Sequence, residues 1–231
     1  MNRPATAPRT PRAADLERWA RGVAMLTRDL QQGRLDPLGW QMAVAAFSRT
    51  LAAGDLLDCF DTAPLGARQR SFGPGEHRVA VLLPGPAGLV GLAAELVLLS
   101  AGSAVPPHGH NNLASVHLVL HGTGQVRLHD RLADLPASVL LRPAGELWLE
   151  PGASFTAAEA AANVHWLSAG ATPLVLLDLV IAVPGAGGFR HPSARDGRLY
   201  LDPTGPVSAA GEIIAPLLDA RTAMARFGGR R

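Results

Sequence analysis

Two histidines stand one residue apart in the segment VPPHGHNN, residues 105–112, directly after a pair of prolines. In an extended chain, residues i and i+2 project from the same face, so the imidazoles of His108 and His110 would converge on one point. Neutral imidazole suits Fe, Zn, Cu and Ni as a ligand. The spacing therefore predicts part of a metal site, provided that the segment is extended and that the fold brings a further ligand to the pair.

The surroundings of this pair carry a longer pattern. His110 is followed by eleven residues and then Gly122, and His165 stands in the segment NVHWLSAGATPLVLLDLVIA, residues 163–182. The order of these segments resembles the cupin superfamily, small jelly-roll barrels in which a His-x-His pair and a later histidine hold a metal. The usual cupin has a glutamate ligand seven residues before the glycine, where this sequence has Ser115. A four-ligand site would need a carboxylate from elsewhere, such as Glu95, Glu146 or Asp178.

A narrower resemblance is to the thiol dioxygenases, the cupin branch in which three histidines alone bind iron. Cysteamine dioxygenase and the plant cysteine oxidases have the same spacing from the histidine pair to the glycine, followed by an Asn-Ile-His-type segment and an apolar strand containing Leu-Asp. They then run into an acidic-Gly-Arg and aromatic segment, to which ARDGRLYLD, residues 194–202, is similar. The likeness covers residues 76–202. It implies that His108, His110 and His165 bind Fe²⁺, with Zn, Ni, Cu or Mn as alternative metals, and that a small thiol and O₂ are the substrates.

Other side chains are candidates for the wall of the same pocket. His117 follows Ser115 at the spacing of one strand face, so it is expected to act as a proton donor, to support a ligand, or to be one. Arg78 is a candidate for binding a substrate carboxylate, as an arginine on an early strand does in cysteine dioxygenases; otherwise it is an exposed strand residue. Ser115 and Tyr200 are further candidates for substrate contact, with core packing as the alternative for Tyr200. Asp178 would orient a ligand histidine or lie at a strand edge.

The elements that must position these residues fall into two parts. Residues 14–33 and 37–53 have apolar side chains at helical spacing, with Trp19 and Trp40 as packing residues, and the pair could cover one end of a barrel. From residue 76, short Val- and Leu-rich runs recur between Gly and Pro. This alternation predicts a mainly β protein, which the resemblance specifies as a single cupin barrel (double-stranded β-helix, jelly roll) with two N-terminal α-helices. We expect a disordered leader over 1–13, a helical segment over 14–69, the barrel over 70–205 and a helical or flexible tail over 206–231.

Bulk composition excludes several classes of function. The 231 residues are enough for one domain with a sizeable core. All 21 basic residues are arginines, which excludes Schiff-base, pyridoxal-phosphate and P-loop chemistry, since each needs a lysine. One cysteine, Cys59, allows neither an internal disulfide nor a thiolate metal cluster. A net charge of +2 does not indicate a nucleic-acid-binding surface. The apolar run 86–105 is interrupted by Glu95, which argues against a membrane span.

The resemblance to the thiol dioxygenases implies a mononuclear non-haem iron dioxygenase that oxidises a small thiol to its sulfinate with O₂, and we expect it to be cytoplasmic. Two alternatives stay open. One is another metal-dependent cupin enzyme, such as a ring-cleaving dioxygenase, an isomerase or a lyase. The other is a non-catalytic cupin that binds a small ligand, because one fold hosts many functions. A homodimer is a further expectation, since cupins often pair.

Overall fold

The computed structural model describes residues 13–58, 60, 69–73, 75–81, 83, 91–159, 161–183, 189, 191–194 and 197–229. The leader predicted over 1–13 lies outside these residues except for its last position. The described helices are α1 (Ala13–Gln31), α2 (Pro37–Ser48), α3 (Ala53–Asp58) and α5 (Ala220–Phe227). The strands are β1 (Gln69–Gly73), β2 (Glu76–Ala80), β3 (Leu92–Leu99), β4 (Ala104–Gly109), β5 (Leu113–His121), β6 (Gly124–Leu135), β7 (Ser138–Leu149), β8 (Ser154–Ala158), β9 (Val164–Ala169), β10 (Leu174–Ala182), β11 (Leu199–Tyr200) and β12 (Ile213–Pro216).

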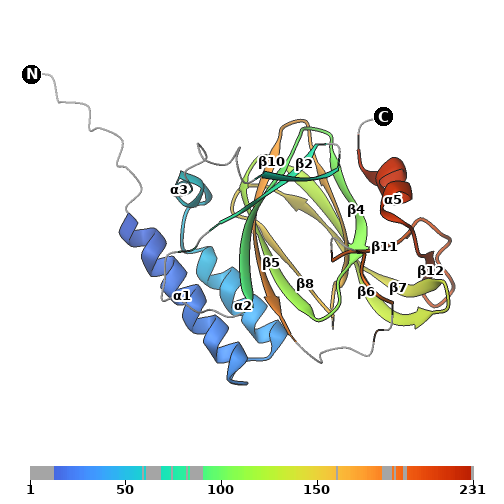
Figure 1. Cartoon of the computed structure of the whole chain (residues 1–231), viewed down its shortest axis with the longest axis horizontal. Helices are drawn as coiled ribbons and strands as arrows, with labels where there is room; N and C mark the ends of the chain where they lie inside the picture. The colour runs from blue at the N-terminus through green and yellow to red at the C-terminus, as the bar shows by residue number, and fades with distance from the viewer. Residues whose placement is uncertain are drawn as a thin grey trace, which may run out of the picture.

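The strands form two six-stranded antiparallel sheets that face each other (Figure 1). The first sheet has the order β1-β2-β3-β10-β5-β8, and the second has the order β11-β4-β9-β6-β7-β12. Strands β3, β10, β5 and β8 of the first sheet and β4, β9, β6 and β7 of the second are connected as two interlocked Greek keys, which is the topology of a jelly roll. The prediction of a mainly β jelly-roll barrel preceded by two helices is therefore confirmed.

Alternation along each strand of the first sheet separates two faces. On β5, Val116 and Leu118 face outward to the helices, whereas Ser115, His117 and Val119 face the space between the sheets. On β10, Asp178 faces the same interior. The polar side chains of this sheet therefore share its inner face with part of the hydrophobic core.

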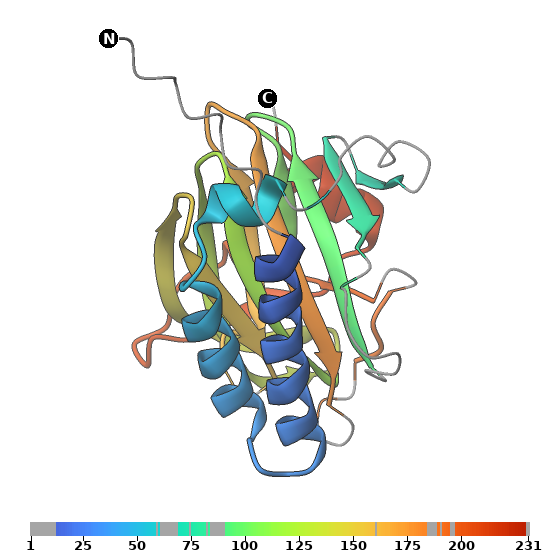
Figure 2. The same cartoon turned by 90° about the vertical axis from the view of Figure 1, so that its left-hand side faces the viewer.

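Helices α1 and α2 lie across the outer face of the first sheet rather than over one end of the barrel (Figure 2). Trp19 and Trp40 are 1% and 0% exposed and pack against that face, as the helical spacing predicts. Their indole nitrogens donate hydrogen bonds to Ser48 (3.0 Å) and Thr27 (3.3 Å), which ties the two helices together. The prediction that the pair covers a barrel end is wrong, because the first sheet needs apolar cover on its outer face along its length.

Helix α2 also contacts the first sheet directly, where β5 pairs with β8. Asp36 caps its first turn by accepting a hydrogen bond from the Gly39 amide, and Pro37 occupies the first helical position, where no amide proton is needed. The buried Gln41 donates from Nε2 to the carbonyl oxygens of Ser115 (2.9 Å) and Ala157 (2.8 Å). The helix thereby holds β5 against β8 at the level of Ser115.

Two segments differ from the expected strand pattern. The apolar runs SVLLRPAG (138–145) and ELWLEPG (146–152), which the Gly and Pro spacing predicts as two strands, are joined in the single strand β7, which ends at Leu149 and shows register shifts where it pairs with β6. The segment 206–231, expected to be a helical or flexible tail, contains the helix α5 but also β12, which pairs with the first residues of β7. Within the described part of the chain, no helix is long and apolar enough to cross a membrane.

Candidate metal centre

Strand β4 carries His108 and ends at Gly109, so His110 is the residue that directly follows the strand. All of its residues are buried, and it pairs antiparallel with β9, so that His108 and His165 are direct partners in the register. A register shift between Val105 and His108 marks the Pro106-Pro107 pair, which has no amide protons to offer the ladder. The ring centroids of His108 and His165 are 4.3 Å apart as a result.

His110 completes a cluster of three imidazoles. Among the described residues, one ligand nitrogen from each of His108, His110 and His165 lies within 4.8 Å of the others, and no carboxylate belongs to this group. The His110 ring is 4.8 Å from that of His108 and 5.6 Å from that of His165, measured between centroids. The structure thus brings the three predicted residues together.

The hydrogen bonds of two rings fix which nitrogen faces the cluster. A carbonyl oxygen only accepts, so Nδ1 of His108 donates to Pro106 (2.8 Å) and Nδ1 of His110 donates to Gly197 (2.9 Å). Both Nε2 atoms therefore keep their lone pairs. Nε2 of His108, the nitrogen not bonded to Pro106, is buried without a hydrogen-bond partner. An orphaned nitrogen among three imidazoles fits a bound cation, and a backbone carbonyl behind a ligand imidazole is the usual support for one.

The three imidazoles are held neutral. Burial lowers the pKa of His108 and of His165 well below the usual value, and a neighbouring imidazole lowers each further. Burial also lowers the pKa of His110 to about 4, although its bond to Gly197 works in the opposite direction. Neutral rings at physiological pH are the form that binds a metal.

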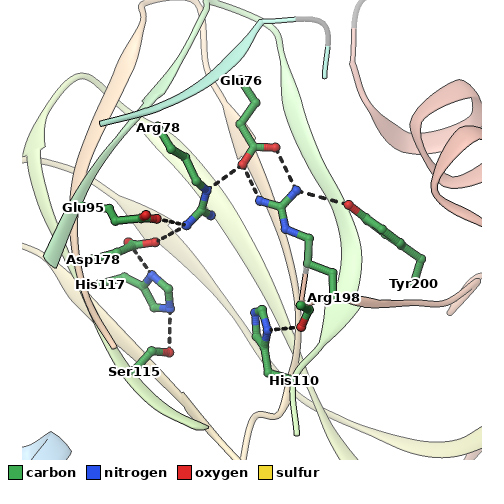
Figure 3. Close-up of polar contacts among 10 residues, drawn as sticks. Glu76, Arg78, Glu95, His110, Ser115, His117, Asp178, Arg198 and Tyr200 are labelled. Atoms are coloured by element: carbon green, nitrogen blue, oxygen red, sulfur yellow. Dashed lines mark hydrogen bonds and ion pairs between the residues drawn. The ribbon is translucent and has the colours of Figure 1, made fainter. Parts of the chain in front are cut away.

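Carboxylates near the cluster are engaged elsewhere. Glu95, Asp178 and His117 are consecutive partners across β3, β10 and β5 on the inner face of the first sheet. Asp178 accepts from Nδ1 of His117 (2.6 Å), and Nε2 of His117 lies 2.9 Å from the Ser115 hydroxyl (Figure 3). Glu146 is 45% exposed on β7 and pairs with Arg127. Asp178 thus orients His117, which is not one of the three clustered histidines.

Arg78 lies at the centre of an acidic cluster on the same face. Its guanidinium contacts Glu76 (3.0 Å), Glu95 (3.3 Å) and Asp178 (3.2 Å), and its side chain is only 14% exposed (Figure 3). Burial alone would raise the pKa of Asp178, but the charge and hydrogen bond of His117, followed by the charge of Arg78, hold it below the ordinary value of 3.8. A substrate carboxylate would have to compete with three carboxylates for this arginine.

A small cavity of about 50 Å³ joins the histidines to the first sheet. Its lining includes His110 and His165 from one side and Ser115, His117 and Arg78 from the other. Tyr200 is 1% exposed, with its ring centroid 6.1 Å from that of His108, and its hydroxyl accepts a hydrogen bond from Arg198 (3.2 Å). The predicted substrate-facing residues Ser115 and Arg78 therefore share one cavity, whereas Tyr200 is a buried neighbour of His108.

Three residues near the cluster were not predicted from the sequence. Asn163 donates from Nδ2 to the carbonyl of His110 (2.8 Å) and is 2% exposed. Glu76 and Arg198 form an ion pair at 1% and 2% side-chain exposure. Asn163 stands two residues before a candidate ligand, which was a usable signal, but nothing local links Glu76 to Arg198.

Comparison with known proteins gives partial matches. No protein-family model matches the chain, and neither does any curated protein. Matching solved structures include KdgF from Halomonas sp., at 21% identity and a TM-score of 0.37 over 51% of this chain and 87% of that one. Another is the Cnp3 cupin domain of Schizosaccharomyces pombe, at 12% identity and a TM-score of 0.36 over 49% and 67%.

A third match is a variant of salicylate 1,2-dioxygenase from Pseudoaminobacter salicylatoxidans, solved with gentisate. It is 20% identical, with a TM-score of 0.34 over 47% of this chain and 26% of that one. Because all three TM-scores are below 0.5, the function has to be argued from the site itself. The strand order and the convergence of three neutral histidines define a jelly-roll protein with a candidate divalent-metal centre.

Proposed function

We propose that this protein is an iron-dependent dioxygenase that adds both atoms of O₂ to the sulfur of a small thiol, so that R–SH and O₂ give the sulfinic acid R–SO₂H. His108, His110 and His165 would hold the metal. When bound there, Fe²⁺ supplies the redox chemistry that lets O₂ react with the thiol sulfur. The observation that carries the proposal is a cluster of three neutral imidazoles without a carboxylate among the described residues.

The missing carboxylate bears on the kind of substrate. Three neutral ligands leave the full charge of a divalent ion uncompensated, so an anionic substrate atom such as a thiolate is a favourable partner. Ser115 stands where a fourth ligand would be expected in a cupin, and it lines the cavity beside His110 and His165. Because serine is shorter than glutamate, it leaves space on that side of the cluster for a substrate atom.

We propose that His117 takes the thiol proton. Its Nδ1–H donates to the Asp178 carboxylate, so in the neutral ring Nε2 carries the lone pair and faces Ser115. The Ser115 hydroxyl has a second acceptor in the carbonyl of Ala157 (3.2 Å), so it can turn away and leave Nε2 free to accept. Once protonated, the ring would be stabilised by Asp178, as an imidazolium is in a Ser-His-Asp arrangement.

The charged network around Arg78 favours an amine over an acid on the substrate. Arg78 and Asp178 line the cavity, and Glu76, Glu95 and Arg198 belong to the same network outside its lining. Three carboxylates and two guanidinium groups give this network a net charge of −1. An ammonium group would be attracted to this network, and a second carboxylate would be repelled. We propose an aminothiol rather than a mercapto acid.

The test is O₂ consumption by the iron-loaded protein with cysteamine, cysteine, 3-mercaptopropionate and a peptide with N-terminal cysteine, with the sulfinate identified by mass spectrometry. We expect turnover with the amine-bearing thiols and loss of both iron and turnover in His108→Ala. His121→Ala, at an exposed histidine of β5, is the matched control and should keep both. Full iron occupancy without O₂ uptake for any of these thiols would refute the proposal and favour a non-oxidative metal enzyme or a binding protein.

A further inference from the structure

The orientation of His110 depends on a segment far along the chain. The carbonyl that accepts its Nδ1–H belongs to Gly197, in a turn where Ala194 and Arg198 are joined by a hydrogen bond of 2.7 Å. Gly197 has a φ of +79°, a conformation that glycine adopts without strain. Strand β11 follows at once and pairs with β4, placing Tyr200 opposite His108. The turn and the histidine pair are therefore neighbours through the sheet.

Arg198 connects this turn to the opposite sheet. Its guanidinium binds both carboxylate oxygens of Glu76 on β2, with Nη1 to Oε2 at 3.1 Å, and also donates to the Tyr200 hydroxyl (Figure 3). Both members of the ion pair are almost fully buried. A bidentate carboxylate–guanidinium pair has a fixed planar geometry, so it sets the position of the Arg198 side chain closely. Glu76 also contacts Arg78, so the ion pair is continuous with the cavity wall.

We propose that the Glu76–Arg198 ion pair is a positioning device for the metal centre: it anchors the turn so that the Gly197 carbonyl holds the His110 ring with Nε2 toward the other two histidines. This inference rests on the proposed role of the three histidines as metal ligands. Glu76 and Arg198 touch neither substrate nor metal in this role. They act through the backbone of Gly197 and the ring of His110.

The structure supports this role in two ways. First, β11 is only two residues long, so its pairing with β4 gives the preceding turn little anchoring of its own. Second, a buried ion pair seldom stabilises a fold more than apolar packing of the same volume would, because both charges lose their hydration. A structural requirement alone would be met by apolar side chains. An ion pair, in contrast, fixes the direction of its side chains. This pair joins the two sheets beside Gly197, whose carbonyl accepts the hydrogen bond from His110.

The experiment compares Arg198→Met and Glu76→Gln with Glu95→Gln. The last variant removes a carboxylate partner of Arg78 but leaves the Glu76–Arg198 pair in place, so it is the matched control. Two quantities are measured on the full chain. One is the set of ¹⁵N shifts of the His110 imidazole in metal-free protein at neutral pH, which reports the tautomer. The other is the affinity for Zn²⁺ and Co²⁺ in competition with a chelator.

We expect the wild type and Glu95→Gln to show His110 protonated at Nδ1 and to bind metal equally. In Arg198→Met and Glu76→Gln, the two tautomers should mix and metal affinity should fall about 10- to 100-fold, the usual effect of losing a ligand's supporting contact. A merely structural role would change unfolding but not the tautomer of the folded protein. If Arg198→Met does not fold, the nearly isosteric Glu76→Gln carries the same comparison.

Wild-type tautomer and wild-type affinity in a folded Arg198→Met or Glu76→Gln protein would overturn the inference. Its failure is distinguishable from failure of the proposed function, because neither measurement needs a thiol or O₂. If the wild type binds no metal, the proposed function falls, while the His110 shifts in metal-free protein still decide whether the ion pair controls the ring.

Discussion

Gly109, between the paired histidines, offers a sharp test of how β4 meets β9. A Cβ at this position would lie 2.5 Å from Oδ1 of Asn163 and 3.2 Å from Cγ2 of Val164. The backbone of Gly109 is not in the left-handed region, so Ala is acceptable to the chain itself. Gly109→Ala must therefore displace the buried Asn163 side chain and break its hydrogen bond to the carbonyl of His110.

The cost follows from these contacts. Overpacking a buried site costs about 1–3 kcal/mol, and losing one hydrogen bond costs about 1 kcal/mol. About 0.4–1 kcal/mol of this cost is offset, because Ala has fewer conformations than Gly in the unfolded chain. We expect Gly109→Ala to lower the free energy of unfolding by about 1–3 kcal/mol and to weaken metal binding, because His110 shifts with its carbonyl.

A double-mutant cycle in urea unfolding identifies the cause. Asn163→Ala removes the oxygen that the new Cβ meets at 2.5 Å and leaves the 3.2 Å contact with Val164. Adding Gly109→Ala to it should therefore cost much less than in the wild type, giving a coupling energy of about 1–3 kcal/mol. Gly54→Ala is a control, because a Cβ there meets no atom within 4 Å. Equal costs of Gly109→Ala with and without Asn163 would refute the reasoning.

Three further outcomes are expected. His165→Ala should leave less than about one-tenth of an equivalent of iron after dialysis, measured by elemental analysis, because two imidazoles are too few to hold the ion; full retention would contradict the three-ligand site. Arg78→Met should destabilise the fold by about 3–5 kcal/mol in urea unfolding, because it removes the cation that Glu76, Glu95 and Asp178 share in a buried cluster. Arg142→Met, which breaks an exposed pair with Glu212, should cost less than about 1 kcal/mol, and similar costs of the two substitutions would contradict the buried cluster. The folded-state pKa of Asp178 lies below its unfolded value, so its contribution to stability is present above pH 4 and is lost as pH falls through the folded pKa. Asp178→Asn should therefore show a smaller drop in urea midpoint than the wild type between pH 5 and 3. Equal drops in the two proteins would contradict the pKa shift of Asp178.

Local spacing predicted the parts of the site that depend on strand geometry. His108 and His110 needed only an extended segment to share a face, and His117 followed Ser115 onto the inner face for the same reason. The convergence of His165 with that pair came from the resemblance to cupins, because its register opposite His108 is set by strand pairing between distant segments.

The placement of the helices was within reach of the sequence but was predicted wrongly. The run LVLLDLVIA of β10 is apolar at both odd and even positions, which is typical of a strand that is covered on both faces. Leu177 and Leu179 do pack outward against the helices, and Leu176 packs inward. A strand with this pattern needs cover along its length, so the helices lie across the sheet rather than over a barrel end.

The ion pair of Glu76 with Arg198 could not be predicted, because its members are 122 residues apart and each looks like an ordinary charged residue in its own segment. The position of Asn163 is similar, since the crossing of its side chain over Gly109 depends on the pairing of β4 with β9. Contacts of this kind depend on how the whole barrel packs, so no periodic pattern in the sequence predicts them.

The two sheets divide the site between them in a way that bears on how it can evolve. The three clustered histidines belong to β9 and to β4 with the residue that follows it, all in the second sheet. The charged residues and His117 that face them across the cavity belong to the first sheet. Substitutions on the first sheet can therefore change the charge and shape of the surface that faces the histidines, while the histidine cluster itself is inherited unchanged.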